Sequence, residues 1–199
     1  MSFVPDKELM VRDFPVCIGA SALLVFFMWD DTLQRWEGVV MLGLMAAYIA
    51  LTVVQALASR TPESEEEPVS LLRCIAFILL GMAAIIWGGD LVVDSASNIA
   101  AALGLSQTLI GLTIVAVGTS LPELATSIVA ARKGESGLAL GNAVGSCIFN
   151  ILFILGASSA LTPIESARGV LMDGIIMTVL TAALFIWCRI RGRMTKPMG

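Results

Sequence analysis

Six long apolar runs restrict what this chain can fold into. Their approximate boundaries are residues 14–30, 38–58, 74–89, 107–131, 137–161 and 169–188. Each run approaches the roughly 20 residues that a helix needs to cross a bilayer. The runs are continuous and rich in Ala, Leu, Ile and Met, without the alternation that is typical of a barrel strand. The sequence therefore predicts an all-α, polytopic transmembrane helix bundle with about six membrane helices in a lipid bilayer.

The composition supports this fold class and excludes several functions. The 199 residues are 57% hydrophobic and 14% charged, with a mean hydropathy of +0.90, which is too apolar for a soluble domain. Histidine, the commonest general base, does not occur in the sequence. Neither a nucleophile–base pair nor a cofactor motif is found. We therefore expect no enzymatic activity, no organic cofactor and no nucleic-acid partner.

The four cysteines lie in or near the apolar runs and lack the spacing of metal ligands. We interpret them as small buried residues. They are Cys17, Cys74, Cys147 and Cys188.

The basic residues predict the orientation of the chain. When the loops between the runs are assigned to alternate sides, two basic residues, Arg35 and Arg168, fall on one side and ten on the other. Because basic loops stay cytoplasmic, we expect both termini in the cytoplasm and the protein in the plasma (inner) membrane. The first 13 residues carry charges of both signs and lead into an apolar run, so no cleaved signal peptide is predicted. The ten basic residues on the side predicted to be cytoplasmic are Lys7, Arg12, Arg60, Arg73, Arg132, Lys133, Arg189, Arg191, Arg193 and Lys196.

Two connecting segments carry further information. Residues 59–70 read SRTPESEEEPVS and are interpreted as a solvated acidic linker between two sub-bundles, with calcium sensing as the alternative. Residues 90–106 have apolar positions at helical spacing. They predict either a continuation of the third helix past the membrane surface or a short interfacial helix. Ser106 is expected to cap the next helix.

The fourth run contains an unusual polar motif, VGTSLPELATS, at residues 117–127. Thr119, Glu123 and Ser127 are four residues apart and share one helix face. Pro122 has no N–H, so it removes the helical partner of the Gly118 carbonyl. The motif therefore predicts an opened helix with carbonyls available around residues 116–119. In a bilayer, such irregular backbone occurs only where it lines a cavity or is buried in protein.

The fifth run repeats the polar pattern with Asn142, Ser146 and Asn150, again at a spacing of four. A short turn around Gly134 joins the fourth and fifth runs, so they are expected to pack antiparallel with facing stripes. Together the two stripes offer hydroxyl, amide, carbonyl and carboxylate oxygens. These hard donors suit Na⁺ or Ca²⁺. Taken alone, the second stripe is more typical of ordinary packing between membrane helices than of an ion site.

At these residues the chain resembles the alpha repeat of the calcium/cation antiporter superfamily, which includes the sodium/calcium exchangers. The resemblance rests on GTSLPEL followed by GNAVGSCIFN, within IGLTIVAVGTSLPELATSIVAARKGESGLALGNAVGSCIFNILFILG, and covers about residues 70–189. It implies that Glu123 is the principal carboxylate for Ca²⁺ and Na⁺. It also implies that Thr119, Ser120 and the Ala116 carbonyl are ligands. Ser146 and Asn150 would complete this half of the site.

The resemblance also implies a domain organisation. Family members have two inverted repeats of five helices, with the ion site between them, and this sequence contains one GTS-x-P-E motif. Residues 1–60 are expected to be the last two helices of the first repeat, and 61–69 an acidic cytoplasmic linker. Residues 70–199 are expected to be the second repeat without its final helix, with the alpha motif at 107–161. The chain would then be half of an inverted-repeat exchanger fold, whose partners include the missing first-repeat helices.

The predicted function is therefore a membrane antiporter that exchanges Ca²⁺ for Na⁺ (or H⁺) by alternating access at a midplane site, of which this chain supplies half. The alternatives are a cation channel or binding module, and a membrane scaffold fragment that transports nothing. Dependence of Ca²⁺ uptake on a Na⁺ gradient would separate an antiporter from a channel. A scaffold would bind ions equally well with and without the Glu123 carboxylate.

Overall fold

The computed structural model describes residues 7–58, 70–165 and 170–191, and nearly all of them are helical. Labels with η denote a π-helix, except for η2, which is a 3-10 helix. The elements are η1 (Leu9–Asp13), α1 (Phe14–Phe27), η2 (Met28–Asp30), β1 (Thr32–Leu33), α2 (Arg35–Ala58), α3 (Leu71–Ala102), α4 (Gln107–Ile110), η3 (Gly111–Val115), α5 (Ala116–Thr119), α6 (Leu121–Arg132), α7 (Ser136–Phe149), η4 (Asn150–Leu155), α8 (Gly156–Leu161), β2 (Ile164–Glu165) and α9 (Val170–Arg191).

Six helical segments are long and apolar enough to cross a membrane, which confirms the predicted fold class. They are Leu9–Asp30, Arg35–Ala58, Leu71–Ala102, Gln107–Arg132, Ser136–Leu161 and Leu171–Ile190. Two boundaries differ from the sequence prediction. The first segment begins at Leu9 and so includes Arg12 and Asp13, and the third begins at Leu71. The third continues as one helix to Ala102, which confirms the first of the two alternatives predicted for residues 90–106. The acidic linker prediction, at 61–69, lies outside the described residues.

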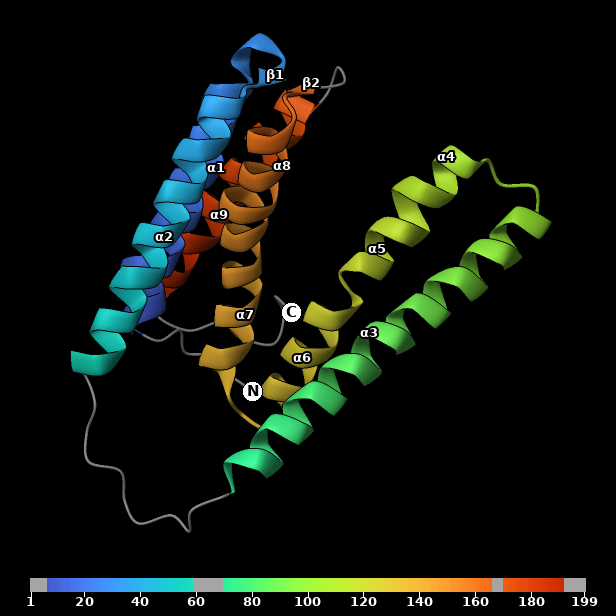
Figure 1. Ribbon diagram of the computed structural model, residues 1–199, viewed down its shortest axis with the longest axis horizontal. Helices are drawn as coiled ribbons and strands as arrows, with labels where there is room; N and C mark the ends of the chain where they lie inside the picture. The colour runs from blue at the N-terminus through green and yellow to red at the C-terminus, as the bar shows by residue number, and fades with distance from the viewer. Residues whose placement is uncertain (1–6, 59–69, 166–169, 192–199) are drawn as a thin grey trace. The chain divides into compact units, whose positions relative to one another are not determined.

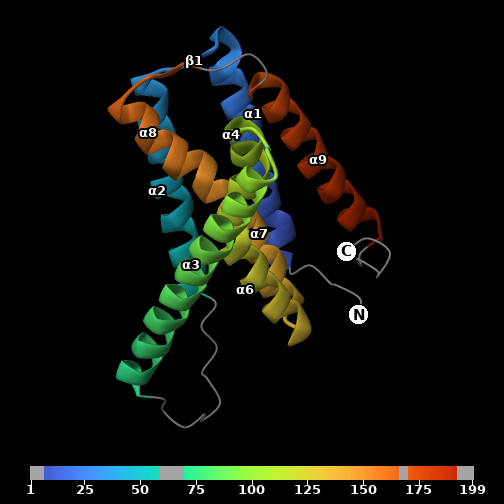
Figure 2. The same ribbon diagram turned by 90° about the vertical axis from the view of Figure 1, so that its right-hand side faces the viewer.

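Contacts divide the chain into two units, residues 1–61 with 130–199 and residues 62–129. In the first unit, α9 packs along α1, and α8 packs against α2 (Figures 1 and 2). Phe14, Met41 and Ile148 are fully buried at the centre of this unit's apolar core. The rings of Phe14 and Phe185 lie 5.8 Å apart and join α1 to α9.

Capping hydrogen bonds and a left-handed glycine determine where several helices begin and end. Glu37 accepts a hydrogen bond from the Gln34 backbone N–H at 2.7 Å, which satisfies a donor at the start of α2. Ser106 accepts from the Leu109 N–H at 3.2 Å and caps α4, as predicted. After α6, Gly134 adopts φ +83°, a left-handed conformation that ends the helix. Within the described ranges, the only strands are β1 and β2, where Thr32 pairs with Glu165 and Leu33 with Ile164.

In the second unit, α3 runs beside η3 and α5 (Figure 1). Gly118 of α5 is buried where α3 passes, and a Cβ added there would collide with the side chain of Val93. Apart from such contacts, α3 presents large apolar side chains outward, among them Phe77, Leu80 and Trp87. Apolar side chains on the outside of a spanning helix match a lipid environment.

Glycines bring α2 and α8 of the first unit into close backbone contact. A Cβ added to Gly38 of α2 would lie 2.5 Å from the Gly156 carbonyl oxygen and 2.6 Å from the Ala160 nitrogen. A Cβ added to Gly156 would in turn lie 3.2 Å from the Gly38 carbonyl oxygen. Backbone therefore meets backbone along this seam, as in other membrane helix pairs built on small residues.

We expect Gly38→Ala to destabilise the protein, because its methyl group would meet backbone atoms that cannot move aside. The cost should be about 1–3 kcal/mol, typical of overpacking, and is measured as a lower midpoint of thermal unfolding in detergent. Gly43→Ala is the matched control, since a Cβ on this α2 glycine meets nothing within 4 Å. Equal unfolding midpoints for the two variants would contradict the close backbone contact between α2 and α8 at Gly38.

Candidate cation site

The helix opens at the GTSLP motif, as the sequence predicts. α5 ends at Thr119, Ser120 adopts φ −95° and ψ −1°, and α6 begins at Leu121. The Ser120 N–H donates to the Val117 carbonyl at 3.0 Å, which is a tighter turn than an α-helix makes. Pro122 then lies in the first turn of α6, where its missing N–H would have had no helical partner. The proline therefore permits the break without leaving a donor unsatisfied.

The hydroxyl groups at this break bind back to their own chain. Thr119 Oγ1 donates to the Ala116 carbonyl at 2.9 Å. A hydroxyl has one hydrogen and two lone pairs, and a carbonyl oxygen also has two. The hydrogen bond from Thr119 therefore occupies one lone pair of the Ala116 carbonyl oxygen. The second lone pair of that carbonyl and both lone pairs of Thr119 Oγ1 are not used by this bond. Both oxygens remain chemically able to contact a cation.

Glu123 is the one carboxylate of the Gln107–Arg132 span. It lies in the first turn of α6 and is half-buried, and its Oε2 atom is buried. The N-terminal end of a helix carries partial positive charge from its unpaired N–H groups, which stabilises a carboxylate there. The break and the carboxylate are thus linked, because the new helix start created at Leu121 places its positive end beside Glu123.

The second predicted stripe lies on the helix formed by α7 and η4. Ser146 is half-buried, and its Oγ donates to the Ala143 carbonyl at 3.1 Å. Asn150 is exposed and is the first residue of η4, where the helix widens from α to π geometry. The sequence does not predict this π segment, since neither glycine nor proline occurs within Asn150–Leu155. Such π segments are frequent at functional sites.

The structure brings the predicted ligands together in two groups. Ala116, Thr119, Ser120 and Glu123 occupy consecutive turns around the break in the second unit. Ser146 and Asn150 occupy adjacent turns in the first unit. Convergence of the two groups on one ion stays a prediction of the sequence. No cluster of three or more His, Cys, Asp or Glu side chains occurs within residues 7–58, 70–165 and 170–191.

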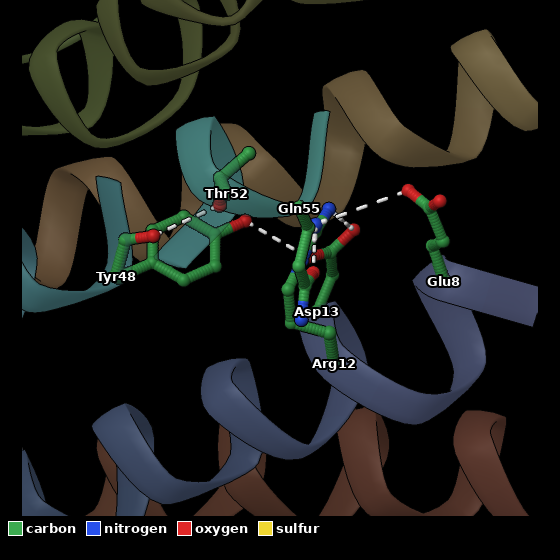
Figure 3. A network of polar contacts seen from close by, with 6 residues as sticks. All are labelled: Glu8, Arg12, Asp13, Tyr48, Thr52 and Gln55. Carbon is green, nitrogen blue, oxygen red and sulfur yellow. Dashed lines mark hydrogen bonds and ion pairs between the residues drawn. The ribbon is translucent and has the colours of Figure 1, made fainter. Parts of the chain in front are cut away.

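Sequence reasoning missed a polar network between the start of the first span and the end of α2 (Figure 3). Arg12 Nε donates to Asp13 Oδ1 at 2.6 Å and its Nη2 to Oδ2 at 3.2 Å. Arg12 Nη1 also donates to Gln55 Oε1 at 2.8 Å and lies 3.9 Å from Glu8 Oε2. Tyr48 donates its hydroxyl hydrogen to Asp13 Oδ1 at 3.0 Å. The charge of Asp13, which is 9% exposed, is therefore compensated from two helices.

A signal for this network was present in the sequence. Tyr48, Thr52 and Gln55 are polar residues at helical spacing in an otherwise apolar run, and Tyr48 is the one tyrosine of the chain. The stripe faces the Arg12–Asp13 pair at the edge of the preceding apolar run.

Comparison with known proteins adds a family match. Residues 74–199 match the family described as "Sodium/calcium exchanger protein". The chain is 35% identical over 194 residues to the candidate antiporter CaxA of Alkalimonas amylolytica, covering 93% of this chain and 61% of that protein. It is 44% identical over 111 residues to the sodium/calcium exchanger MaX1 of Methanosarcina acetivorans, covering 55% of this chain and 32% of MaX1.

Solved structures agree with these sequence matches. A structure of the sodium-calcium exchanger NCX_Mj, soaked with zero Na⁺ and Ca²⁺, superposes with a TM-score of 0.77 at 28% sequence identity. The superposition covers 96% of this chain and 61% of that chain. The chain thus spans about three fifths of the length of CaxA and of NCX_Mj.

We expect Tyr48→Phe to lower the free energy of unfolding by about 1–2 kcal/mol, because it removes a hydrogen bond to the Asp13 carboxylate while keeping the ring. Thermal or chemical denaturation in detergent measures the loss. Thr52→Val serves as control, since the Thr52 hydroxyl donates only within its own helix, to the Tyr48 carbonyl at 2.9 Å. If the two variants lose equal stability, the hydrogen bond to Asp13 does not stabilise the contact between η1 and α2.

Proposed function

The chain belongs to the sodium/calcium exchanger family, and from this premise we propose that it forms part of an antiporter that exchanges Ca²⁺ for Na⁺ (or H⁺). The observation that carries the proposal is the helix break at Ser120, followed within one turn by the Glu123 carboxylate, inside an apolar span. A carboxylate in a membrane span is costly and is normally functional or paired. A broken helix that offers its N-terminal end and free carbonyl lone pairs is the usual ion site of secondary transporters.

The proposed ligands are oxygen atoms of two segments. The first segment contributes the Ala116 carbonyl, the Thr119 and Ser120 hydroxyls and the Glu123 carboxylate. The second contributes the Ser146 hydroxyl and the Asn150 amide oxygen. All are hard donors of the kind that Ca²⁺ and Na⁺ prefer, and hydroxyls that donate to backbone carbonyls keep lone pairs for a cation.

Charge arithmetic supports the idea that these residues supply one half of a site. Glu123 is the single carboxylate among the six proposed ligands, so a bound Ca²⁺ would keep one uncompensated positive charge. Ca²⁺ also takes six to eight ligands. A second, inverted set of helices would supply the missing carboxylate and oxygens, and the family relatives are longer than this chain.

Alternating access around this site is the proposed mechanism. In the proposed organisation, residues 1–60 are the last two helices of the first repeat, 61–69 the cytoplasmic linker and 70–199 the second repeat. The bias of the basic residues supports cytoplasmic termini and insertion in the plasma (inner) membrane. Repeats of opposite topology that rock about a fixed midplane site are the common route to antiport.

We expect Glu123→Gln to weaken Ca²⁺ binding by the chain in lipid nanodiscs at least tenfold, about 1.4 kcal/mol, because the substitution removes the charge and keeps the shape. Radioactive Ca²⁺ binding, with Na⁺ and K⁺ as competitors, measures the effect. Glu135→Gln is the matched control, because this exposed glutamate lies in the turn before α7. Competition by Na⁺ but not by K⁺ would support an exchanger site.

Unchanged Ca²⁺ binding in the Glu123→Gln variant would leave only a scaffold role and would overturn the proposal. Flux measurements in vesicles separate the remaining alternatives. A half site predicts little Na⁺-driven Ca²⁺ uptake by these 199 residues alone. A Ca²⁺ flux of the same size with and without a Na⁺ gradient would instead identify a channel.

Asn150→Asp should strengthen Ca²⁺ binding by roughly tenfold, since a second carboxylate would compensate the remaining charge of the ion. The same binding assay measures the change. Asn98→Asp is the control, because it introduces the same charge at an exposed position of α3. Equal effects of the two substitutions would show that Asn150 acts only through the overall charge of the protein.

A further inference from the structure

The first unit contains a groove between the first span and α2, which we call the α1–α2 groove. It has an apolar part, a cavity of about 270 Å³, and a polar part, a cavity of about 440 Å³. Arg12 lines both cavities, so the two parts adjoin at this side chain. The apolar part is walled on one side by Val16, Gly19 and Leu23 and on the other by Leu44, Ala47 and Leu51.

The α1–α2 groove is about as deep as one leaflet of a bilayer. It extends from Arg12 to Leu23 along the first span and from Gln55 to Leu44 along α2. At a rise of about 1.5 Å per residue, each side is about 16 Å long, half of a hydrocarbon core that is about 30 Å thick. The polar part lies at the start of the first span and the end of α2, where spanning helices meet the membrane surface. The apolar part therefore matches the length of a lipid acyl chain in a single leaflet.

Small side chains leave room in the apolar part. A Cβ added to Gly19 would meet nothing within 4 Å, and Ala47 carries only a methyl group on the α2 side. Leu44 and Leu51 are exposed along the same wall. An open groove with apolar walls favours a hydrocarbon ligand, because nothing in it satisfies a polar one.

The polar part carries charges of both signs. Two hydrogen bonds to the Asp13 carboxylate already compensate the charge of Arg12. Lys7 and Glu8 are exposed and line the polar part, and Glu8 lies 3.9 Å from Arg12 (Figure 3). Lys7 and Glu8 together have no net charge. They complement a headgroup with one phosphate and one ammonium group better than a headgroup with a net negative charge.

We propose that the α1–α2 groove binds one molecule of phosphatidylethanolamine. One acyl chain lies along the apolar part, the phosphate binds Lys7, and the ammonium group donates hydrogen bonds to the Glu8 carboxylate. A choline headgroup has no N–H to donate to Glu8, and a glycerol headgroup has no positive charge there. The site uses no residue of the candidate cation site and does not depend on ion exchange.

The test uses the full chain, freed of lipid in detergent and titrated with phosphatidylethanolamine, phosphatidylcholine or phosphatidylglycerol that carry the same acyl chains. Native mass spectrometry counts the lipid molecules bound to each chain. We expect one phosphatidylethanolamine to bind about tenfold more tightly than either of the other lipids. Glu8→Gln should remove the preference over phosphatidylcholine, and Lys7→Gln should weaken binding of all three lipids because each carries the phosphate.

Gly19→Leu tests the apolar part, because its side chain would fill the space of the acyl chain. It should weaken binding of phosphatidylethanolamine about tenfold. Gly43→Leu is the matched control, since Gly43 does not line the groove and a Cβ there also meets nothing within 4 Å. Circular dichroism checks that both variants keep their helices.

Three outcomes would overturn the proposal. Equal affinity for the three lipids would mean that the chain binds only unspecific surrounding lipid, and tighter binding of phosphatidylglycerol would contradict the assigned headgroup. Equal losses in Gly19→Leu and Gly43→Leu would place the lipid outside the groove. A dimer that forms without lipid and dissociates in Gly19→Leu would show that a second copy of the chain occupies the groove instead.

Discussion

Backbone hydrogen bonding in a medium without water is the constraint on which the rest of this structure depends. All six candidate spans are helical, and a helix pairs its N–H and C=O groups within its own segment, as a lipid environment requires. The departure at Ser120 follows the same rule. A tight turn uses the Ser120 N–H, the Thr119 hydroxyl binds the Ala116 carbonyl, and Pro122 has no N–H to satisfy. The break therefore strands no backbone donor at Ser120 or Pro122, and the N–H groups at the start of α6 lie at the end of the motif that carries the Glu123 carboxylate.

The two polar regions of the described chain use this rule differently. Around Arg12 and Asp13, donors and acceptors are matched between η1 and α2, so this network links the two elements. Around Thr119, the hydroxyl hydrogen is bound within the chain, while lone pairs of the Thr119 hydroxyl and of the Ala116 carbonyl remain. A region with surplus acceptors and one negative charge favours a cation, whereas a matched network has no need of one.

The sequence predicts those parts of the fold that depend on local chemistry. Apolar run length predicts the spans to within a few residues at most ends, Ser106 predicts a cap, and the GTSLP motif predicts the break. The missed features depend on contacts between distant residues. Tyr48 meets Asp13 only because the folded chain brings α2 beside η1, although 35 positions separate the two residues. The π geometry that begins at Asn150 has no local signal. For residues 90–106 the sequence leaves two alternatives, and the third helix extends to Ala102 because no helix breaker follows its apolar run until Gly104.

The glycine seam between α2 and α8 has a mechanical consequence. The close backbone contact between Gly38 and Gly156 leaves little space for α2 and α8 to slide past each other, so we expect the two helices to move together. Helix α8 is continuous with η4 and α7 within Ser136–Leu161, the span that carries Ser146 and Asn150. A movement of α2 would therefore also move the helix segment that carries Ser146 and Asn150.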